Sequence, residues 1–291
     1  MKRFFIQLSV AVFLLSVFSF RSLGADIYTL EFNLEKGKIY KQRSVSEMTM
    51  TINAMGQDME MDMKTETSIH FNVVERNNDV YDISMSYQKI KMDMNVMQSY
   101  SIDSDSPGNS VLQSFIGIPI DIQLTKEGKV SIKDADQFAT KIDAITDEQL
   151  KQIISQLLSE KAIQSTFERL SFFPGKPVAV GDSWDVTTNA SAGGIDIINK
   201  LELTLKQVKD NIAILEVAGT LSTPEGGAVM QVNGMDAEVS AKGIQTGTIR
   251  IDIKTGWIVG SEINQKSTQN IEIMGYSIPQ EVEIKLTVTA D

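Results

Sequence analysis

Apolar and polar residues alternate along most of the chain. Segments with this two-residue period, many of them rich in β-branched residues, are TSIHFNVVE, DVYDISMSY, KIKMDMNVM, KLELTLKQV, IAILEVAG, GTIRIDIKT and EVEIKLTVT. Such alternation is typical of strands with one buried and one solvated face. Turn-forming clusters such as ERNND (75–79), KEGK (126–129) and KTG (254–256) separate the segments. The pattern therefore predicts an antiparallel meander of about ten or more strands.

One central segment has a helical period instead. In ITDEQLKQIISQLLSEKAIQSTFERL, residues 145–170, apolar residues recur at spacings of three and four. This predicts a helix over 146–170, with Thr146 as the N-cap and Gln149 completing a capping box. Pro174 and Gly175 would stop it. A shorter helix is expected at about 134–143.

Helices in the middle of the chain with strands on both sides favour a mostly β (α+β) fold. We predict a long, strongly curved antiparallel sheet, as a half-barrel or barrel, with the central helix packed on its concave side. Residues 26–291 would form a single domain, with a helical insertion at about 134–172.

The two ends of the chain resemble each other. The segment LEKGKIYKQRSVSEMTMTINAMGQDMEM (34–61) aligns with IKTGWIVGSEINQKSTQNIEIMGYSIPQ (253–280). Gly37 and Gly56 are nineteen residues apart, as are Gly256 and Gly275, and each second glycine follows a methionine. We interpret the match as an internal repeat of two equivalent long hairpins.

Methionine is concentrated in the first of these hairpins. Six of the fourteen methionines lie between residues 47 and 66. A two-residue turn at Gly56 pairs residues whose numbers have an odd sum, because glycine supplies the positive φ that such turns need. Met48, Met50 and Ile52 then share a face with Met59, Met61 and Met63, and Thr49, Asp58 and other polar residues occupy the opposite face.

This thioether face has three interpretations. Thioethers are soft ligands that select Cu(I). Methionine also lines adaptable apolar binding surfaces, and it packs ordinary cores. The second hairpin has Ile271, Ile273, Ile278, Val282 and Ile284 at the equivalent positions, so the fold needs an apolar face there but not methionine. Core packing is favoured by this comparison, and the copper interpretation stays open.

The first 25 residues resemble a signal peptide. Lys2 and Arg3 precede the apolar stretch FFIQLSVAVFLLSVFSF, and SLGA offers small residues for cleavage. This stretch is shorter than the roughly 20 residues that a spanning helix needs. We expect residues 1–25 to be removed and the protein to be periplasmic or extracellular, with no membrane span after cleavage. The chain has no cysteine, which excludes disulfides and a lipid-modified cysteine anchor.

Removing Lys2, Arg3 and Arg21 leaves 24 basic and 38 acidic residues, a net charge of −14. Nucleic acid is therefore not expected as a partner, because a polyanion is repelled by an acidic surface.

Residues suited to catalysis are scarce. His70 is the only histidine, and strand alternation places it opposite Ile69 and Phe71 on the outward face. No nucleophile elbow, phosphate loop or metal-protease helix occurs. The turn DSDSPGN (103–109) lacks the acidic residue that closes a calcium loop. We expect no enzymatic activity, no cofactor and no metal site.

The segment FFPGKPVAVGDSW (172–184) is the most distinctive loop. It is interpreted either as a latch over a pocket or as a helix-to-strand connection anchored by Phe172, Phe173 and Trp184. The anchored connection is favoured, because Pro174 and Pro177 make the loop rigid.

The leader, the opening LEKGKIYKQ and the segment FPGKPVAVGDSWDV resemble an uncharacterised family of exported bacterial envelope proteins. The residues that carry this resemblance are Gly37, Pro174, Pro177, Gly181, Asp182, Ser183 and Trp184. The resemblance implies export and a mostly β fold, and it implies no activity. A more distant architectural analogy is to periplasmic carriers of lipoproteins and lipids, which wrap a curved sheet around an apolar cavity.

These features favour a non-enzymatic exported envelope protein that binds a lipid-like, apolar or amphiphilic ligand in a cavity. The alternative is a structural or protein-interaction module of the envelope with an envelope protein as its partner and no small-molecule ligand. The residues predicted to line the cavity are Met48, Met50, Met59, Met61, Met63, Met92, Met94 and Trp184.

Overall fold

The structure, a computed structural model, describes residues 26–54, 56–96, 99–160, 163–164, 172–192, 195–232 and 235–290. Most of these residues form one 13-stranded antiparallel sheet, accompanied by a second sheet of two strands. The expected signal peptide, residues 1–25, lies outside the described residues.

The long strands of the large sheet are β2 (Ile39–Ala54), β3 (Gln57–Asn77), β4 (Val80–Asn95), β10 (Ile195–Lys209), β13 (Met235–Asp252), β14 (Ile258–Ile273) and β15 (Tyr276–Ala290). Its shorter strands are β5 (Ser99–Asp103), β6 (Ile120–Thr125), β7 (Val130–Asp134), β9 (Ser183–Ala192), β11 (Ile212–Ser222) and β12 (Ala228–Val232). The small sheet pairs β1 (Ile27–Tyr28) with β8 (Val178–Ala179). The helices are α1 (Ser110–Gln113), α2 (Asp136–Asp143) and α3 (Glu148–Leu158).

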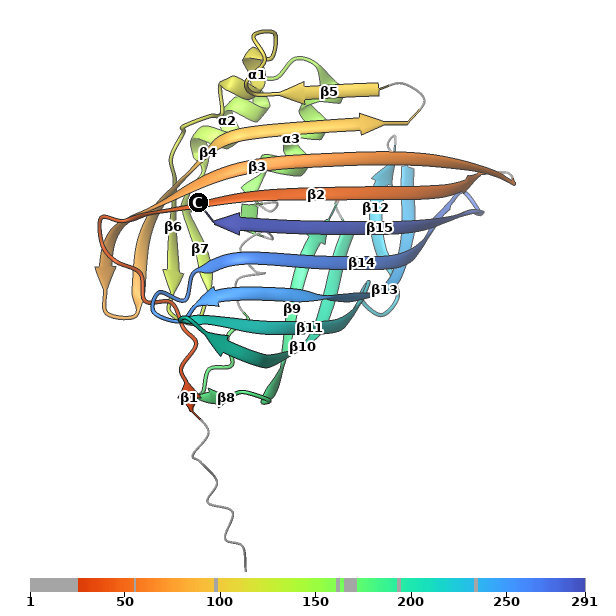
Figure 1. Ribbon diagram of the computed structural model, residues 1–291. Helices are drawn as coiled ribbons and strands as arrows, with labels where there is room; N and C mark the ends of the chain where they lie inside the picture. The colour runs from red at the N-terminus through yellow and green to blue at the C-terminus, as the bar shows by residue number, and fades with distance from the viewer. Residues whose placement is uncertain are drawn as a thin grey trace, which may run out of the picture.

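The first and last long strands of the chain meet in the middle of the sheet. The strand order is β7-β6-β4-β3-β2-β15-β14-β13-β11-β10-β9, so two meanders run outward from the β2–β15 pair (Figure 1). The predicted antiparallel meander is confirmed, and the sheet is curved but not closed into a barrel. The half-barrel alternative is therefore correct, and the barrel alternative is wrong.

The helices lie in the connection between the two far edges of the sheet. Both α2 and α3 follow β7 and precede β9, and in Figure 1 they lie behind the long strands. The predicted helix at 134–143 is confirmed. The predicted N-cap of the longer helix is wrong, because Asp147 caps α3 by accepting a hydrogen bond from the Leu150 amide at 3.0 Å. Helix α3 ends at Leu158, where Ser159 has an extended ψ of 156°.

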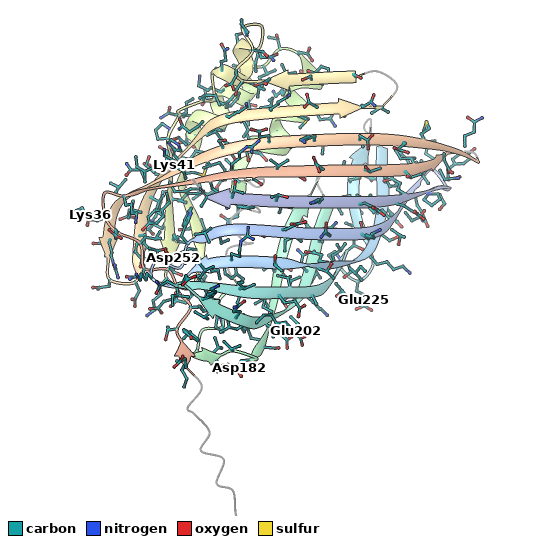
Figure 2. The ribbon with its side chains drawn as sticks, viewed as in Figure 1. Lys36, Lys41, Asp182, Glu202, Glu225 and Asp252 are labelled. Carbon is teal, nitrogen blue, oxygen red and sulfur yellow. The ribbon has the colours of Figure 1, made fainter. Side chains whose placement is uncertain are left out.

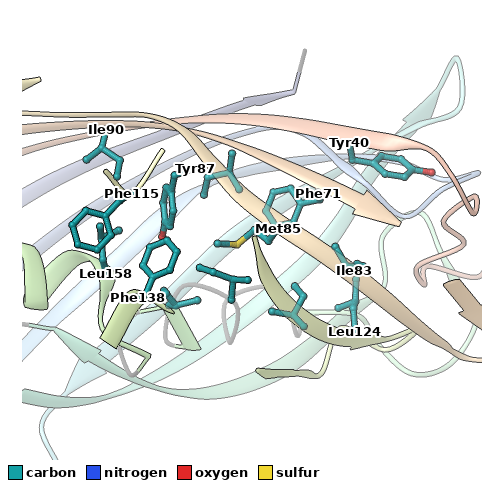
Figure 3. Packing of buried hydrophobic residues seen from close by; sticks show 14 of the residues in the cluster. Tyr40, Phe71, Ile83, Met85, Tyr87, Ile90, Phe115, Leu124, Phe138 and Leu158 are labelled. Atoms are coloured by element: carbon teal, nitrogen blue, oxygen red, sulfur yellow. The ribbon is translucent and has the colours of Figure 1, made fainter. Parts of the chain in front are cut away.

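The helices cover one half of the concave face and form an aromatic core there (Figure 3). In Figure 3 the rings of Phe115 and Phe138 lie near Tyr87 of β4. The centroids of the Phe115 and Phe138 rings are 5.4 Å apart. The side chains of Ile154 and Leu158 from α3 are almost fully buried in this aromatic core. Each such burial contributes about 1.5–3 kcal/mol, so packing against the sheet stabilises a helix of this length.

A second cluster, the aliphatic core, lies over β10, β11 and β13. Its buried members include Leu203, Leu205, Leu215 and Ile251. Trp184 of β9 also belongs to it.

The segment before β2 joins the two halves of the molecule. The Phe32 amide donates to the Lys126 carbonyl at 2.8 Å, and the Asn33 amide donates to the Thr255 carbonyl at 2.9 Å. The Phe32 ring lies 6.3 Å from that of Trp257, centroid to centroid. This segment therefore connects the β6–β7 turn to the β13–β14 turn and covers the same end of the sheet as the helices.

The curvature of the sheet requires glycine at three positions on the concave face. A Cβ atom on Gly219, Gly243 or Gly247 would lie less than 3.0 Å from backbone atoms of the adjacent strand. Glycine inside a strand marks a tight bend or a close backbone approach. These glycines of β11 and β13 allow the strands to come together where the sheet bends.

We expect Gly247→Ala to lower the free energy of unfolding by about 1–3 kcal/mol, because the added methyl group meets the Glu262 carbonyl and the Ile263 side chain. Chemical denaturation monitored by circular dichroism measures this change. Gly108→Ala is the matched control, because its added methyl group meets nothing within 4 Å. Equal stability of the two variants would contradict the role of Gly247 in the bend.

One buried hydroxyl on the concave face lacks a partner. Ser267 of β14 is 6% exposed, and its Oγ makes no hydrogen bond to any of the described residues. We therefore expect Ser267→Ala to raise the free energy of unfolding by about 1 kcal/mol in a denaturant titration, since an unsatisfied buried polar atom is removed.

Ser104→Ala is the contrasting control. Ser104 is also buried, but its Oγ accepts a hydrogen bond from the Ile90 amide at 3.1 Å. Removing that acceptor should destabilise the protein by about 1–2 kcal/mol. The prediction for Ser267 is refuted if both variants lose stability alike.

Candidate functional site

The predicted shared face of the methionine hairpin is confirmed, and the structure decides which of the registers with an odd sum is formed. Met48 pairs with Met63, Met50 pairs with Met61, and Ile52 pairs with Met59 across β2 and β3. On the other side of β2, Met48 pairs with Ile284 and Met50 with Val282 of β15. The methionine hairpin and the hairpin β14–β15 therefore lie side by side and share one concave face. The internal repeat that aligned them stays a prediction.

Burial of this face decreases along the strands. On β3, Val73 is fully buried, whereas Met61 and Met63 are half-buried and Met59 near the turn is 36% exposed. Met48 and Met50 of β2 are also half-buried. We call the part of the concave face beyond the helices, from residue 48 to residue 63 and from residue 265 to residue 284, the open half. Its methionines and Ile284 are only partly covered by the protein, whereas Val282, the strand partner of Met50, is buried.

The predicted cavity residues divide between the two halves. Met48, Met50, Met59, Met61 and Met63 lie on the open half. Met94 of β4 pairs with Met63 and is half-buried, whereas Met92 is 4% exposed and belongs to the aromatic core.

Trp184 belongs to the aliphatic core and is not among the residues that the register places beside the methionines. Its indole N–H donates to the Phe172 carbonyl at 2.8 Å. The Asp182 carboxylate accepts from the Ala179 amide at 2.8 Å, and Gly181 has a φ of 101°. The segment 172–184 is thus held as an anchored connection, which agrees with the favoured interpretation.

The concave face has no acidic side chain, lysine or arginine at its described positions on four long strands. On β2 and β15 the even-numbered positions lie on this face, and on β3 and β13 the odd-numbered positions do. None of these described positions holds Asp, Glu, Lys or Arg, with β3 counted as far as Val73, since a bulge follows Val73 and changes the alternation before Glu75. Figure 2 labels two of the outward charges, Lys41 and Glu202. Half-exposed yet uncharged, this face is suited to contact with apolar groups.

Uncharged polar side chains form a strip beside the methionines, which sequence reasoning missed. Gln265 and Gln269 of β14 are half-buried on the concave face, and Gln265 pairs with Gln245 of β13. Gln269 pairs with Gln280 of β15. The signal was present in NQKSTQN (264–270), where alternation places Gln265, Ser267 and Gln269 on the face of the isoleucines.

A trough of about 640 Å³ crosses β14, β15, β2, β3, β4 and β5. Each strand contributes three consecutive residues to the lining of the trough. The middle one, such as Met48 or Met63, is a concave-face residue, and its two chain neighbours belong to the outer face. Residues two positions away, which share a face with the central one, do not line it. This pattern places the trough on the outer face, between two cross-strand rows of side chains.

Four of the charged side chains that line this trough form two ion pairs. Lys64 contacts Glu47 at 2.7 Å, and Lys266 contacts Glu283 at 2.7 Å. The hydrogen bond from Lys64 lowers the pKa of Glu47. Such exposed cross-strand pairs contribute little to stability.

Other titratable groups lie away from the open half. His70 is half-buried on the outer face, where it pairs with Lys41. Burial raises the pKa of the Tyr87 phenol in the aromatic core, so that this phenol stays neutral. Among the described residues no group of three or more His, Cys, Asp or Glu side chains is placed to hold a metal ion. Within the described ranges no helix is long and apolar enough to cross a membrane.

Comparison with solved structures shows the fold. The sheet is similar to that of a lipovitellin structure on lipid–protein interactions, with a TM-score of 0.50 and 10% identity. The match covers 89% of this chain but 25% of that chain, so this protein spans about a quarter of it.

Two weaker likenesses carry no argument. A putative outer membrane lipoprotein-sorting protein domain from Vibrio parahaemolyticus has a TM-score of 0.14 and 8% identity, and the match covers 82% of each chain. An outer membrane channel from Pseudomonas putida F1 has a TM-score of 0.21 and 8% identity, over 89% of this chain and 97% of that one.

No curated protein sequence matches the chain. A family model described as a family of unknown function (DUF6263) matches residues 78–258, which is more than half of the chain and includes the segment 172–184. The chain therefore belongs to this family of unknown function, DUF6263.

Proposed function

We propose that this protein is a non-enzymatic exported envelope protein that binds an apolar or amphiphilic, lipid-like ligand on the open half of its concave face. The observation that carries the proposal is a group of partly exposed methionines on a face whose described positions there carry no charged side chain. Met48, Met50 and Met61 stay half-buried there, although the same face is fully covered at the other end of the sheet.

Two further observations support the proposal. Methionine is flexible and polarisable, so a methionine surface adapts to ligands of varied shape. The similar lipovitellin structure is described by its lipid–protein interactions, and the large curved sheet is the feature that it shares with this chain. Export rests on the leader, whose residues lie outside the described part of the chain.

The first test is native mass spectrometry of protein purified without detergent from an exporting host, followed by organic extraction. We expect a reproducible excess mass that extraction identifies as lipid. A clean protein mass that is unchanged by incubation with lipids would refute the proposal and favour a protein-interaction module.

A charge placed on the open half should weaken binding. We expect Met50→Lys to reduce the affinity for the apolar fluorescent probe N-phenylnaphthylamine by about tenfold, because an ammonium group replaces an apolar contact between Met61 and Val282. Fluorescence titration measures the affinity.

Thr51→Lys is the matched control. Thr51 is the next residue of β2 and lies on the outer face, where it pairs with Glu60 and Glu281. We therefore expect the Thr51→Lys variant to fold and to bind the probe with unchanged affinity. Met61→Lys tests the same surface if Met50→Lys does not fold. Unchanged affinity in every folded concave-face variant would place the probe elsewhere and overturn the proposal.

A further inference from the structure

Beside the methionines of the open half, the concave face has a strip of amide and hydroxyl side chains. Register places on the concave face of β10, β13, β14 and β15 the residues Asn199, Gln245, Gln265, Ser267, Gln269 and Gln280. We call these six residues the amide strip. All of them are uncharged.

The amide strip and the methionines are immediate neighbours. Gln265 pairs with Ile284 of β15, and Ile284 pairs with Met48 of β2. Met48 pairs in turn with Met63 of β3. Neighbouring strands are about 4.8 Å apart, so a row from Gln265 to Met63 is roughly 14 Å long. One molecule can therefore contact the polar and the apolar part of this face together.

The amide strip divides into an internally bonded part and a part open to a ligand. The Gln245 amide donates to the Asn199 carbonyl oxygen at 2.6 Å, and the Asn199 amide lies 3.5 Å from the Thr188 hydroxyl. Gln265, Gln269 and Gln280 have no side-chain hydrogen bond to any other described residue, and all three are half-buried. Each presents both amide donors and carbonyl acceptors toward the concave side.

The same face disfavours an ionised group. Bringing a charge onto a largely apolar surface costs free energy unless an opposite charge compensates it. The described concave-face positions of β2, β3, β13, β14 and β15 contain no such charge. Amides and hydroxyls instead match uncharged hydrogen-bonding groups such as hydroxyls, esters and amides.

Building on the proposed function, we propose that the ligand is an uncharged amphiphile. Its hydrogen-bonding group lies against Gln265, Gln269 and Gln280, and its hydrocarbon lies on the methionines of β2 and β3.

The test compares three amphiphiles with the same chain length on the full protein: 1-monolauroylglycerol, laurate and dodecyltrimethylammonium. Each is titrated below its micelle-forming concentration, at pH 7, against bound N-phenylnaphthylamine. We expect the uncharged glyceride to displace the probe with an affinity about tenfold or more above that of either ion. Equal or tighter binding of an ion overturns the inference.

A substitution within the strip separates hydrogen bonding from apolar contact. Gln265→Met keeps the side-chain volume and removes the amide, so we expect a threefold to tenfold loss of affinity for monolauroylglycerol, as for one neutral hydrogen bond of about 0.5–1.5 kcal/mol. Affinity for N-phenylnaphthylamine should not fall. Asn264→Leu, on the exposed outer face of the same strand, is the control and should change neither value.

The two proposals fail in different ways. If wild-type protein binds neither the probe nor any amphiphile, the proposed function fails and this inference fails with it. If the probe binds and Met50→Lys weakens it, but Gln265→Met leaves glyceride affinity unchanged or the ions bind as well as the glyceride, only the uncharged-amphiphile inference fails.

Discussion

The concave face of the sheet is packed against helices at one end and only partly covered at its methionines, and the rest of this structure depends on that difference. A long sheet has more apolar inner surface than the helical connection and the segment before β2 can bury. Phe32, Phe138 and Leu158 close the aromatic core at one end, where Val73 and Ile83 are almost completely shielded from solvent. Toward the β2–β3 turn Met50 and Met61 remain half-buried among the residues that the structure describes. Met50 and Met61 therefore lie toward the opposite end of β2 and β3 from the fully packed aromatic core.

Chain connectivity explains which end is covered. The two meanders start from the central pair of β2 and β15, so the strands β7 and β9 form the two far edges. The connection between those edges contains α2 and α3, and these helices pack against β4 and its neighbours. Curvature brings the edges toward each other, and Gly219, Gly243 and Gly247 remove the side chains that would oppose it. The bend and the helical bridge therefore support one another.

Chemistry is separated between the two faces. Charged side chains on the outer face pair across strands, as Lys64 does with Glu47, and keep that face solvated. The concave face carries thioethers and aliphatic groups on β2 and β3 and amides on β13 and β14. This division gives the open half an apolar part and a hydrogen-bonding part within a few strand spacings. The trough of the outer face is, by contrast, lined by charged and polar side chains, among them the pairs Lys64–Glu47 and Lys266–Glu283.

Local patterns in the sequence determined the long strands and the shared face of the methionines in the first hairpin. They did so because alternation and a glycine turn act over a few residues, whereas the structure decided that Met48 lies opposite Met63. They were less reliable at the helix start, where Asp147 rather than Thr146 is the cap, since both residues are competent acceptors one position apart. Only the tertiary structure decided that Met92 is core while Met50 is half-exposed, although both occupy the same kind of strand position. That difference depends on which distant segments cover each strand, and contacts between residues far apart in the chain have no local period from which to predict them.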